Sequence, residues 1–204
     1  MARRPPGSLL AVSSPSRLRR PTLFLERSLE APYEPESVVD APLIGFDAFS
    51  IDQRIFGWVR LSADRLTDLL NAHEEFELDN AQIEQLTDAR VASIDRLVVN
   101  RDRLIAVRAG GPQGDPARRQ RLRLHPLVVR AGLFRIGGYL HVRPGVAPLA
   151  EVRDRPKMIP LSSAWLEYRG DGRRKAQWVG TILFNRDKTD SIEVVGEADL
   201  GTEE

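Results

Sequence analysis

The 204-residue chain contains no cysteine. This absence excludes disulfide bonds, thiolate nucleophiles, zinc sites built on thiolates and iron–sulfur clusters. It is typical of a cytosolic protein, and we predict a cytoplasmic location. The chain also lacks a dinucleotide-binding glycine fingerprint and a phosphate-binding loop, so we expect no cofactor.

Long apolar runs and an excess of one charge are absent as well. No apolar run approaches the roughly 20 residues of a membrane-spanning helix, so we predict no membrane insertion. The 30 basic and 29 acidic residues leave a net charge of +1, which gives no overall attraction to nucleic acid. The three histidines (His73, His125 and His141) lack metal-ligand spacing. These absences favour a binding function, with an enzyme that uses only Asp, Glu and Arg as an alternative.

The chain does contain an internal repeat, because residues 41–109 and 125–195 resemble two diverged copies of one unit. The best match joins Val98–Asp102 to Leu183–Asp187, since each ends in Asn-Arg-Asp. Such a match indicates the size of the structural unit. Three further blocks follow the same order in both copies: Gly57–Leu61 with Gly138–Val142, Leu66–Leu69 with Leu149–Val152, and Leu86–Val91 with Leu161–Leu166.

The remaining segments have compositions that differ from the repeat units. Residues 1–40 are rich in proline and basic near the start, so we predict a disordered segment that would contact nucleic acid or anionic lipid only non-specifically. Its apolar stretch Leu9–Val12 is too short for a signal peptide. Residues 110–124, which begin with Gly110-Gly111-Pro112, are predicted to be a linker, and residues 196–204 an acidic tail.

Hydrophobic periodicity predicts the elements of each unit. Alternation over residues 55–61 and 136–142 indicates half-buried strands, and Gly57 and Gly138 in the buried rows suggest a bend or a close backbone crossing. A short helix is expected after each of these strands. We read the acidic run around Phe76 as a solvated face. The remaining strands are expected at residues 86–93, 97–107, 161–168 and 177–195.

This order of elements resembles the Sm-like small β-barrel. Leu97–Val107 is similar to its second signature, with Asp102 where that signature has glycine. The resemblance implies an α+β, strand-dominated fold of two tandem small β-barrel-like (Sm- or SH3-like) units with a short helix each. It also implies RNA contact near the turns, or assembly through strand edges. In addition, Arg65–Asn71 (Arg-Leu-x-Asp-Leu-Leu-Asn) resembles an uncharacterised bacterial family that implies no activity.

These patterns favour a non-catalytic interaction or scaffold protein, with a protein partner or self-assembly. The alternative is RNA binding through the repeated turns and a basic hairpin tip. An Arg-Asp pair at a turn ordinarily forms a local ion pair that fixes the corner, and this structural interpretation is favoured over an anion contact. Trp58 and Tyr139 would either stack on bases or bury against the neighbouring copy or a helix. The candidate anion or nucleic-acid contacts are Asn100, Arg101, Asn185, Arg186, Arg173, Arg174 and Lys175.

Overall fold

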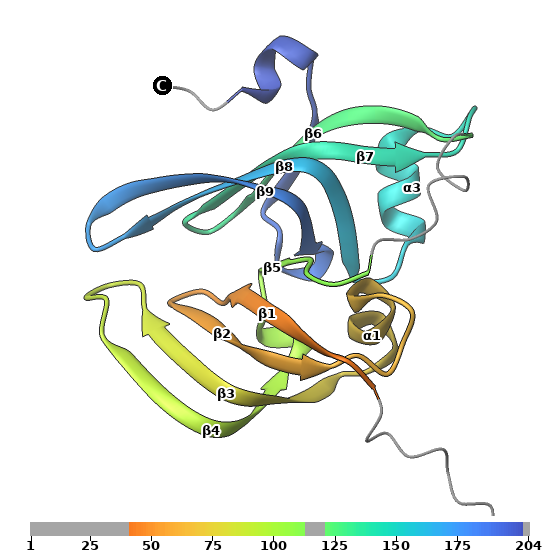
Figure 1. The fold of residues 1–204 in the computed structure, drawn as a ribbon. Coiled ribbons are helices and arrows are strands. Elements are labelled where there is room, and N and C mark those ends of the chain that lie inside the picture. The colour runs from red at the N-terminus through yellow and green to blue at the C-terminus, as the bar shows by residue number, and fades with distance from the viewer. Residues whose placement is uncertain (1–40, 113–120, 202–204) are drawn as a thin grey trace, which may run out of the picture. The chain divides into compact units, whose positions relative to one another are not determined.

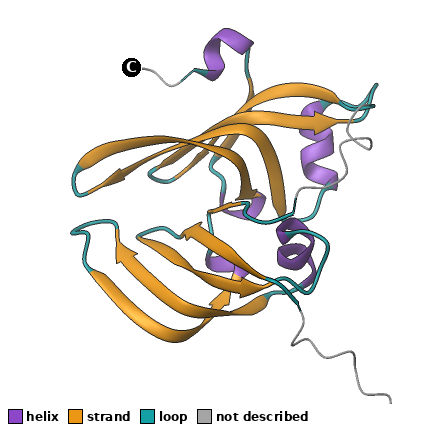
Figure 2. Cartoon of the chain, in the orientation of Figure 1, coloured by secondary structure: helices purple, strands orange, loops and turns teal. Residues whose placement is uncertain are grey.

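The computed structural model describes residues 41–112 and 121–201, which belong to one compact unit spanning Val39–Glu204. Strands dominate this part of the chain, as predicted, and two short α-helices accompany them (Figures 1 and 2). Neither helix is long and apolar enough to cross a membrane. The predicted N-terminal segment 1–40, most of the predicted linker and the last three residues of the predicted tail lie outside the described residues.

The two halves of this unit contain the same elements in the same order: two strands, a helix, two strands, a 3-10 turn and a short strand. A further 3-10 turn, η4 (Glu197–Leu200), ends the second half. In the first half they are β1 (Leu43–Phe49), β2 (Gln53–Arg60), α1 (Leu66–Ala72), β3 (Glu75–Gln85), β4 (Val91–Asn100), η2 (Arg101–Arg103) and β5 (Ala106–Arg108). In the second half they are β6 (Arg123–Ala131), β7 (Phe134–Val142), α3 (Pro148–Asp154), β8 (Met158–Gly170), β9 (Arg173–Asn185), η3 (Arg186–Lys188) and β10 (Ser191–Val194).

The ten strands of the described residues form one open antiparallel sheet, in the order β10-β6-β7-β8-β9-β5-β1-β2-β3-β4. Each half therefore contributes five neighbouring strands, with its last strand beside its first. The expectation of two closed barrel-like units is not confirmed. The two sets of strands join instead, because β5 of the first half pairs with β9 of the second as well as with β1.

The β5–β9 pair places side chains from each half in the core of the other. In the register of this pair, Ala106 lies opposite Phe184 and Val107 lies opposite Leu183. Ala106 and Phe184 belong to a core built mainly by the second half, and Val107 and Leu183 to a core built mainly by the first. All four side chains are fully buried. Burial of this kind contributes roughly 25 cal/mol per Å² of apolar surface, so each half stabilises the other.

The glycines in the buried rows have the predicted role. Both β2 and β7 contain a bulge, between Phe56 and Trp58 and between Gly137 and Tyr139. A Cβ on Gly138 would lie 3.0 Å from the Cβ atoms of Ala164 and Leu161, so the glycine permits the close approach of β8.

The strand expected over residues 86–93 is right only for its last three residues, because β4 begins at Val91. The preceding residues of that range contain the turn between β3 and β4, and β3 instead runs through the acidic segment that was read as a solvated face. Along β3, Phe76 and Leu78 are buried while Glu75 and Glu77 are exposed. The charged residues thus occupy the outer face of a half-buried strand.

Candidate functional site at the joint between the two halves

The two Asn-Arg-Asp sequences form equivalent 3-10 turns at the ends of β4 and β9. The side-chain oxygen of Asn100 accepts a hydrogen bond from the backbone N–H of Asp102 at 2.8 Å, and that of Asn185 accepts one from Asp187 at 3.1 Å. Asparagine favours this arrangement because its side chain bonds to the backbone two residues further on. The predicted tight turns are confirmed at both positions.

The two arginines of these turns bind the C-terminal ends of the helices. Nη1 of Arg101 donates to the carbonyl oxygens of Leu70 and His73 at the end of α1, at 3.3 and 3.4 Å. Nη1 of Arg186 donates to carbonyl oxygens at the end of α3, those of Val152, Arg153 and Arg155, at 2.6 to 3.1 Å. A cation stabilises a helix C-terminus, where carbonyl groups have no partner within the helix.

Each arginine also pairs with the aspartate that follows it. Nε of Arg101 lies 3.0 Å from Oδ1 of Asp102, and Nε of Arg186 lies 3.5 Å from Oδ1 of Asp187. The local ion pair that fixes the corner is therefore present in both halves. Contact of Asn100, Arg101, Asn185 and Arg186 with RNA stays a prediction.

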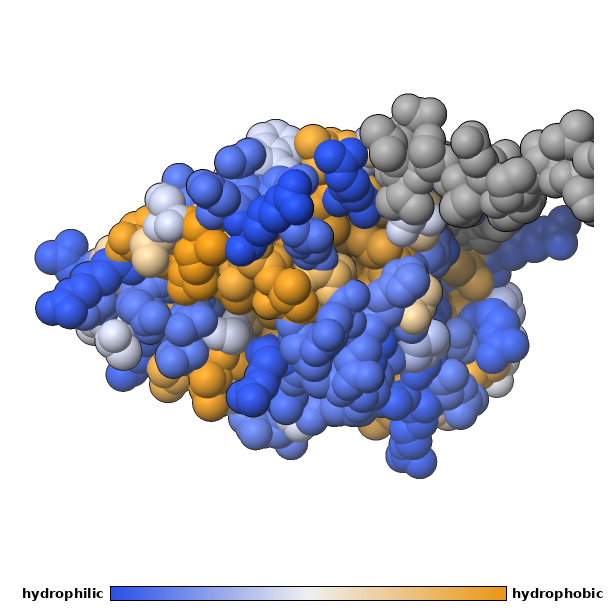
Figure 3. Space-filling model, turned by 90° about the horizontal axis from the view of Figure 1, so that it is seen from below, coloured by the Kyte–Doolittle hydropathy of each residue, from blue (hydrophilic) through white to orange (hydrophobic). Residues whose placement is uncertain are grey.

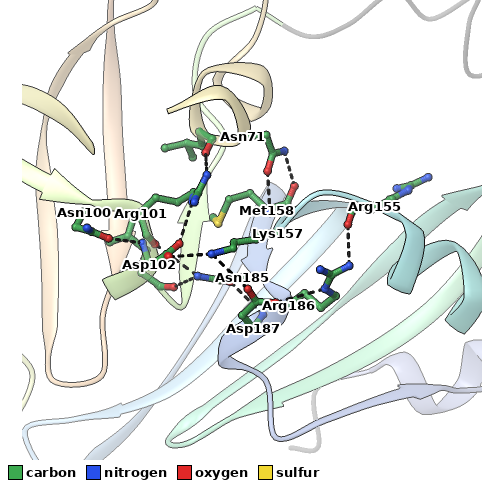
Figure 4. Close-up of polar contacts among 12 residues, drawn as sticks. Asn71, Asn100, Arg101, Asp102, Arg155, Lys157, Met158, Asn185, Arg186 and Asp187 are labelled. Carbon is green, nitrogen blue, oxygen red and sulfur yellow. Dashed lines mark hydrogen bonds and ion pairs between the residues drawn. The ribbon is translucent and has the colours of Figure 1, made fainter. Parts of the chain in front are cut away.

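The pairing of β5 with β9, which we call the joint, brings these two turns together. The turns lie far apart in the sequence but close together in the structure (Figure 4). Asn185 is 99% buried, since only 1% of its surface is exposed. Its Nδ2 donates to the carbonyl oxygen of Leu104 at 3.0 Å, and its backbone N–H donates to that of Ile105 at 2.9 Å. One asparagine therefore holds its own turn and binds the chain of the other half.

Lys157, just before β8, bridges the two turns. Its Nζ lies 2.8 Å from Oδ2 of Asp102 and 3.5 Å from Oδ2 of Asp187. The hydrogen bond from Lys157, followed by the one from Arg101, lowers the pKa of Asp102, although desolvation opposes this effect. The same hydrogen bond to Asp102 raises the pKa of Lys157. Sequence reasoning missed this lysine, since it has no counterpart in the repeated motif.

The Arg65–Asn71 segment gives a second polar contact across the joint. Asn71 of α1 donates from Nδ2 to the carbonyl oxygen of Met158 and accepts from its backbone N–H, both at 3.0 Å. Arg65 and Asp68 form a bidentate ion pair at the start of the helix. Nε and Nη2 of Arg65 each lie 2.8 Å from a carboxylate oxygen of Asp68. This pair raises the pKa of Arg65. The polar residues of the motif thus fix α1 and attach it to β8.

The predicted basic tip, Arg173–Lys175, lies at the β8–β9 hairpin. It is at the opposite end of β9 from the turn that begins with Asn185. Arg173 is exposed, whereas Nε of Arg174 lies 2.6 Å from Glu167 Oε1. Nζ of Lys175 lies 3.8 Å from Glu84 of β3. Figure 1 shows the β8–β9 and β3–β4 hairpins side by side, and the backbone N–H of Asp171 donates to the Leu86 carbonyl at 2.8 Å. The tip and the corners are thus separate sites, and contact of the tip with RNA stays a prediction.

The outer faces of the two halves are covered differently. In the second half, Trp165 is fully buried under Leu200 of η4, and its Nε1 donates to the Leu200 carbonyl. In the first half, Trp58 is 43% exposed and Phe56 is 42% exposed. Of the two alternatives for Trp58, burial is therefore wrong, and stacking on bases stays a prediction. Figure 3 shows hydrophobic side chains among hydrophilic ones on the surface seen from below.

A pocket of about 660 Å³ opens beside the joint, between α1, β8 and residues 109–112. Within it, Nε2 of His141 lies 2.8 Å from Oγ of Ser162. The two arginines that line it, Arg65 and Arg155, are bonded to Asp68 and Glu151. Across residues 41–112 and 121–201, no three His, Asp or Glu side chains converge in a way that would hold a metal ion.

The polar residues of the joint are thus engaged with backbone and with one another. Their arrangement attaches β5 of the first half to β9 of the second. Comparison of the chain with protein-family models, with curated proteins and with solved structures gave no match.

Proposed function

We propose that this chain is a non-catalytic interaction or scaffold protein, and that it binds a strand of another protein along the open edge of β4. The observation that carries the proposal is a difference between two equivalent residues. Leu183 of β9 is fully buried, whereas Val98, which precedes Asn100 as Leu183 precedes Asn185, is 65% exposed.

The exposure of Val98 reflects its place on the outer face of the first half, where it pairs with the exposed Glu77 of β3, together with the position of β4 in the sheet. β4 is an end strand that pairs with β3 within the described residues, whereas the equivalent β9 lies between β8 and β5. Leu183 on β9 packs into the core of the first half. Val98 would receive the same kind of cover from a strand added beside β4.

Asn100 supports the same reading. Asn185 uses Oδ1 for its turn and Nδ2 for Leu104 of the neighbouring strand. Among the described residues, Asn100 uses Oδ1 for its turn and makes no hydrogen bond through Nδ2. We expect this amide to donate to an incoming chain, as Nδ2 of Asn185 does to Leu104. Addition of a strand to a sheet edge is a common mode of protein recognition, in which backbone hydrogen bonds supply affinity.

The test compares capture of binding proteins by the wild type and by a Val98→Lys variant. A lysine on an edge strand blocks strand addition, and the exposed position predicts a change in stability within about 0.5 kcal/mol. Leu133→Lys is the matched control, since Leu133 is 59% exposed in the turn between β6 and β7. We expect a protein that the wild type and the control retain and that Val98→Lys loses, with direct binding reproduced between purified partners.

Retention of every binding protein by Val98→Lys would contradict this proposal. Salt-sensitive binding of single-stranded RNA by the wild type and Val98→Lys alike would favour the RNA alternative. Loss of such binding on Arg173→Ala would then assign it to the hairpin tip.

A further inference from the structure

The residue just before β3 is acidic, whereas the equivalent residue just before β8 is basic. The backbone N–H of Arg101 donates to the carbonyl of Glu74 at 2.7 Å, and that of Arg186 donates to the carbonyl of Lys157 at 2.9 Å. Glu74 and Lys157 therefore hold the same position relative to their turns. The first half therefore has an exposed glutamate at the position where the second half has the lysine that reaches Asp102.

The ammonium group of Lys157 has a defined partner. Lys157 belongs to the half that contributes β9, and its shortest ion pair is to Asp102 of the half that contributes β5. Arg101 and Arg186 cap helices next to the two edges in the same way, so they do not distinguish one edge from the other. The two edges therefore differ in the charge of one equivalent residue, which is Glu74 near β4 and Lys157 near β9.

A second copy of this chain is poorly matched to the open edge. The strand equivalent to β5 is β10, and its corner carries Asp187 where the first half carries Asp102. Asp187 would then lie near Glu74, and like charges at an interface oppose association. The following residues differ too, because Thr189 and Asp190 replace the buried Leu104 and Ile105.

We infer that the β4 edge selects a strand of a different protein, one that carries a lysine or arginine where the first half carries Asp102, followed by apolar residues like Leu104–Val107. This inference rests on the proposed function and specifies the partner of the same edge. The incoming cation would pair with Glu74, and an apolar side chain would cover Val98. The open edge thereby rejects further copies of the chain.

Two fluorescent peptides test this selection on the full chain. One has the sequence of residues 101–109, and the other has the same sequence with Asp102→Lys. We expect the wild type to bind the lysine peptide about tenfold more tightly in low salt, because the change replaces a repulsive pair by an attractive one. The preference should reverse in Glu74→Lys and remain in Glu193→Lys, which makes the same charge change on β10. Fluorescence anisotropy gives both affinities.

Equal affinities for the two peptides, absence of binding to either, or an unchanged preference in Glu74→Lys would overturn the inference. So would concentration-dependent self-association of the wild type that Val98→Lys abolishes. The proposed function fails separately, by retention of every captured protein in Val98→Lys. If Val98→Lys loses a native partner while Glu74→Lys keeps it with full affinity, the edge binds a partner but the charge selection is wrong.

Discussion

Asn100 and Asn185 make the same turn in different surroundings, and this allows one residue to serve as the control for the other. Asn185 is almost fully buried and bonds across the joint, whereas Asn100 is half-buried and bonds within its turn. Removal of a buried hydrogen-bonding group leaves its partners unsatisfied, which costs more than loss of a partly exposed one.

We predict that Asn185→Ala lowers the free energy of unfolding by about 2 kcal/mol, because the Leu104 carbonyl and the Asp187 N–H lose a buried partner. Asn100→Ala should cost about 1 kcal/mol, as the loss of a capping side chain does. Urea denaturation of both variants measures the difference. Equal losses would mean that the hydrogen bond across the joint contributes nothing beyond the turn.

The pair formed by Asp102 and Lys157 makes stability depend on pH at both extremes. The pKa of Asp102 is lowered in the folded protein, so its contribution is complete above its unfolded pKa of about 3.9 and is lost as the pH falls through the folded value. The pKa of Lys157 is raised, so its contribution is complete below an unfolded pKa of about 10.4 and is lost as the pH rises through the folded value.

We therefore predict that Asp102→Asn is less stable than the wild type near neutral pH, and that the two converge below pH 4. Urea midpoints between pH 3 and pH 7 test this expectation, with Asp88→Asn as the control for an exposed ion pair away from the joint. A constant difference across that range would show that the Asp102 carboxylate does not respond to Lys157.

At the scale of elements, a strand could be predicted from the sequence only where apolar and polar residues alternate clearly along it. β2 and β7 were predictable because their buried rows alternate with polar or aromatic residues. β3 was missed because glutamates on its exposed face hide the buried Phe76 and Leu78. β1 was missed because residue 44 and residues 46–49, including the charged Asp47, are all buried, so the strand shows no alternation of apolar and polar residues.

The two Asn-Arg-Asp turns of the site could be predicted from the sequence, whereas their proximity in the structure could not. Asn, Arg and Asp determine the turns through local bonds, which a sequence reveals. The joint depends on pairing of β5 with β9, and no local pattern indicates which strands pair across such a separation. Lys157 and Asn71 act only through that pairing, so the sequence alone gave no sign of their role at the joint.

For the whole molecule, the two shared cores predict a single unfolding transition. Phe49 and Leu86 of the first half belong to the core built mainly by the second half, and Met158 and Leu183 complete the core of the first. Neither core is complete within one half. Loss of either half therefore exposes buried surface in the other, which makes unfolding cooperative.

Two variants with one tryptophan each test this prediction. Trp165→Phe with Trp178→Phe leaves Trp58 in the first half, and Trp58→Phe with Trp178→Phe leaves Trp165 in the second. In each variant, we expect the urea midpoint from tryptophan fluorescence to coincide with the midpoint from far-UV circular dichroism. Separate midpoints would show that the halves unfold independently.

The β5–β9 pair has a consequence for dividing the protein into fragments. A fragment that ends after β5 would keep a short strand whose second neighbour is gone, with the apolar side chains of Leu104–Val107 left without part of their cover. A fragment that begins at β6 would expose Leu183 in the same way. The interval between β5 and β6 divides the repeat but does not divide the folding unit. Fragments cut there should be obtained by co-expression, as two pieces that recombine into one sheet.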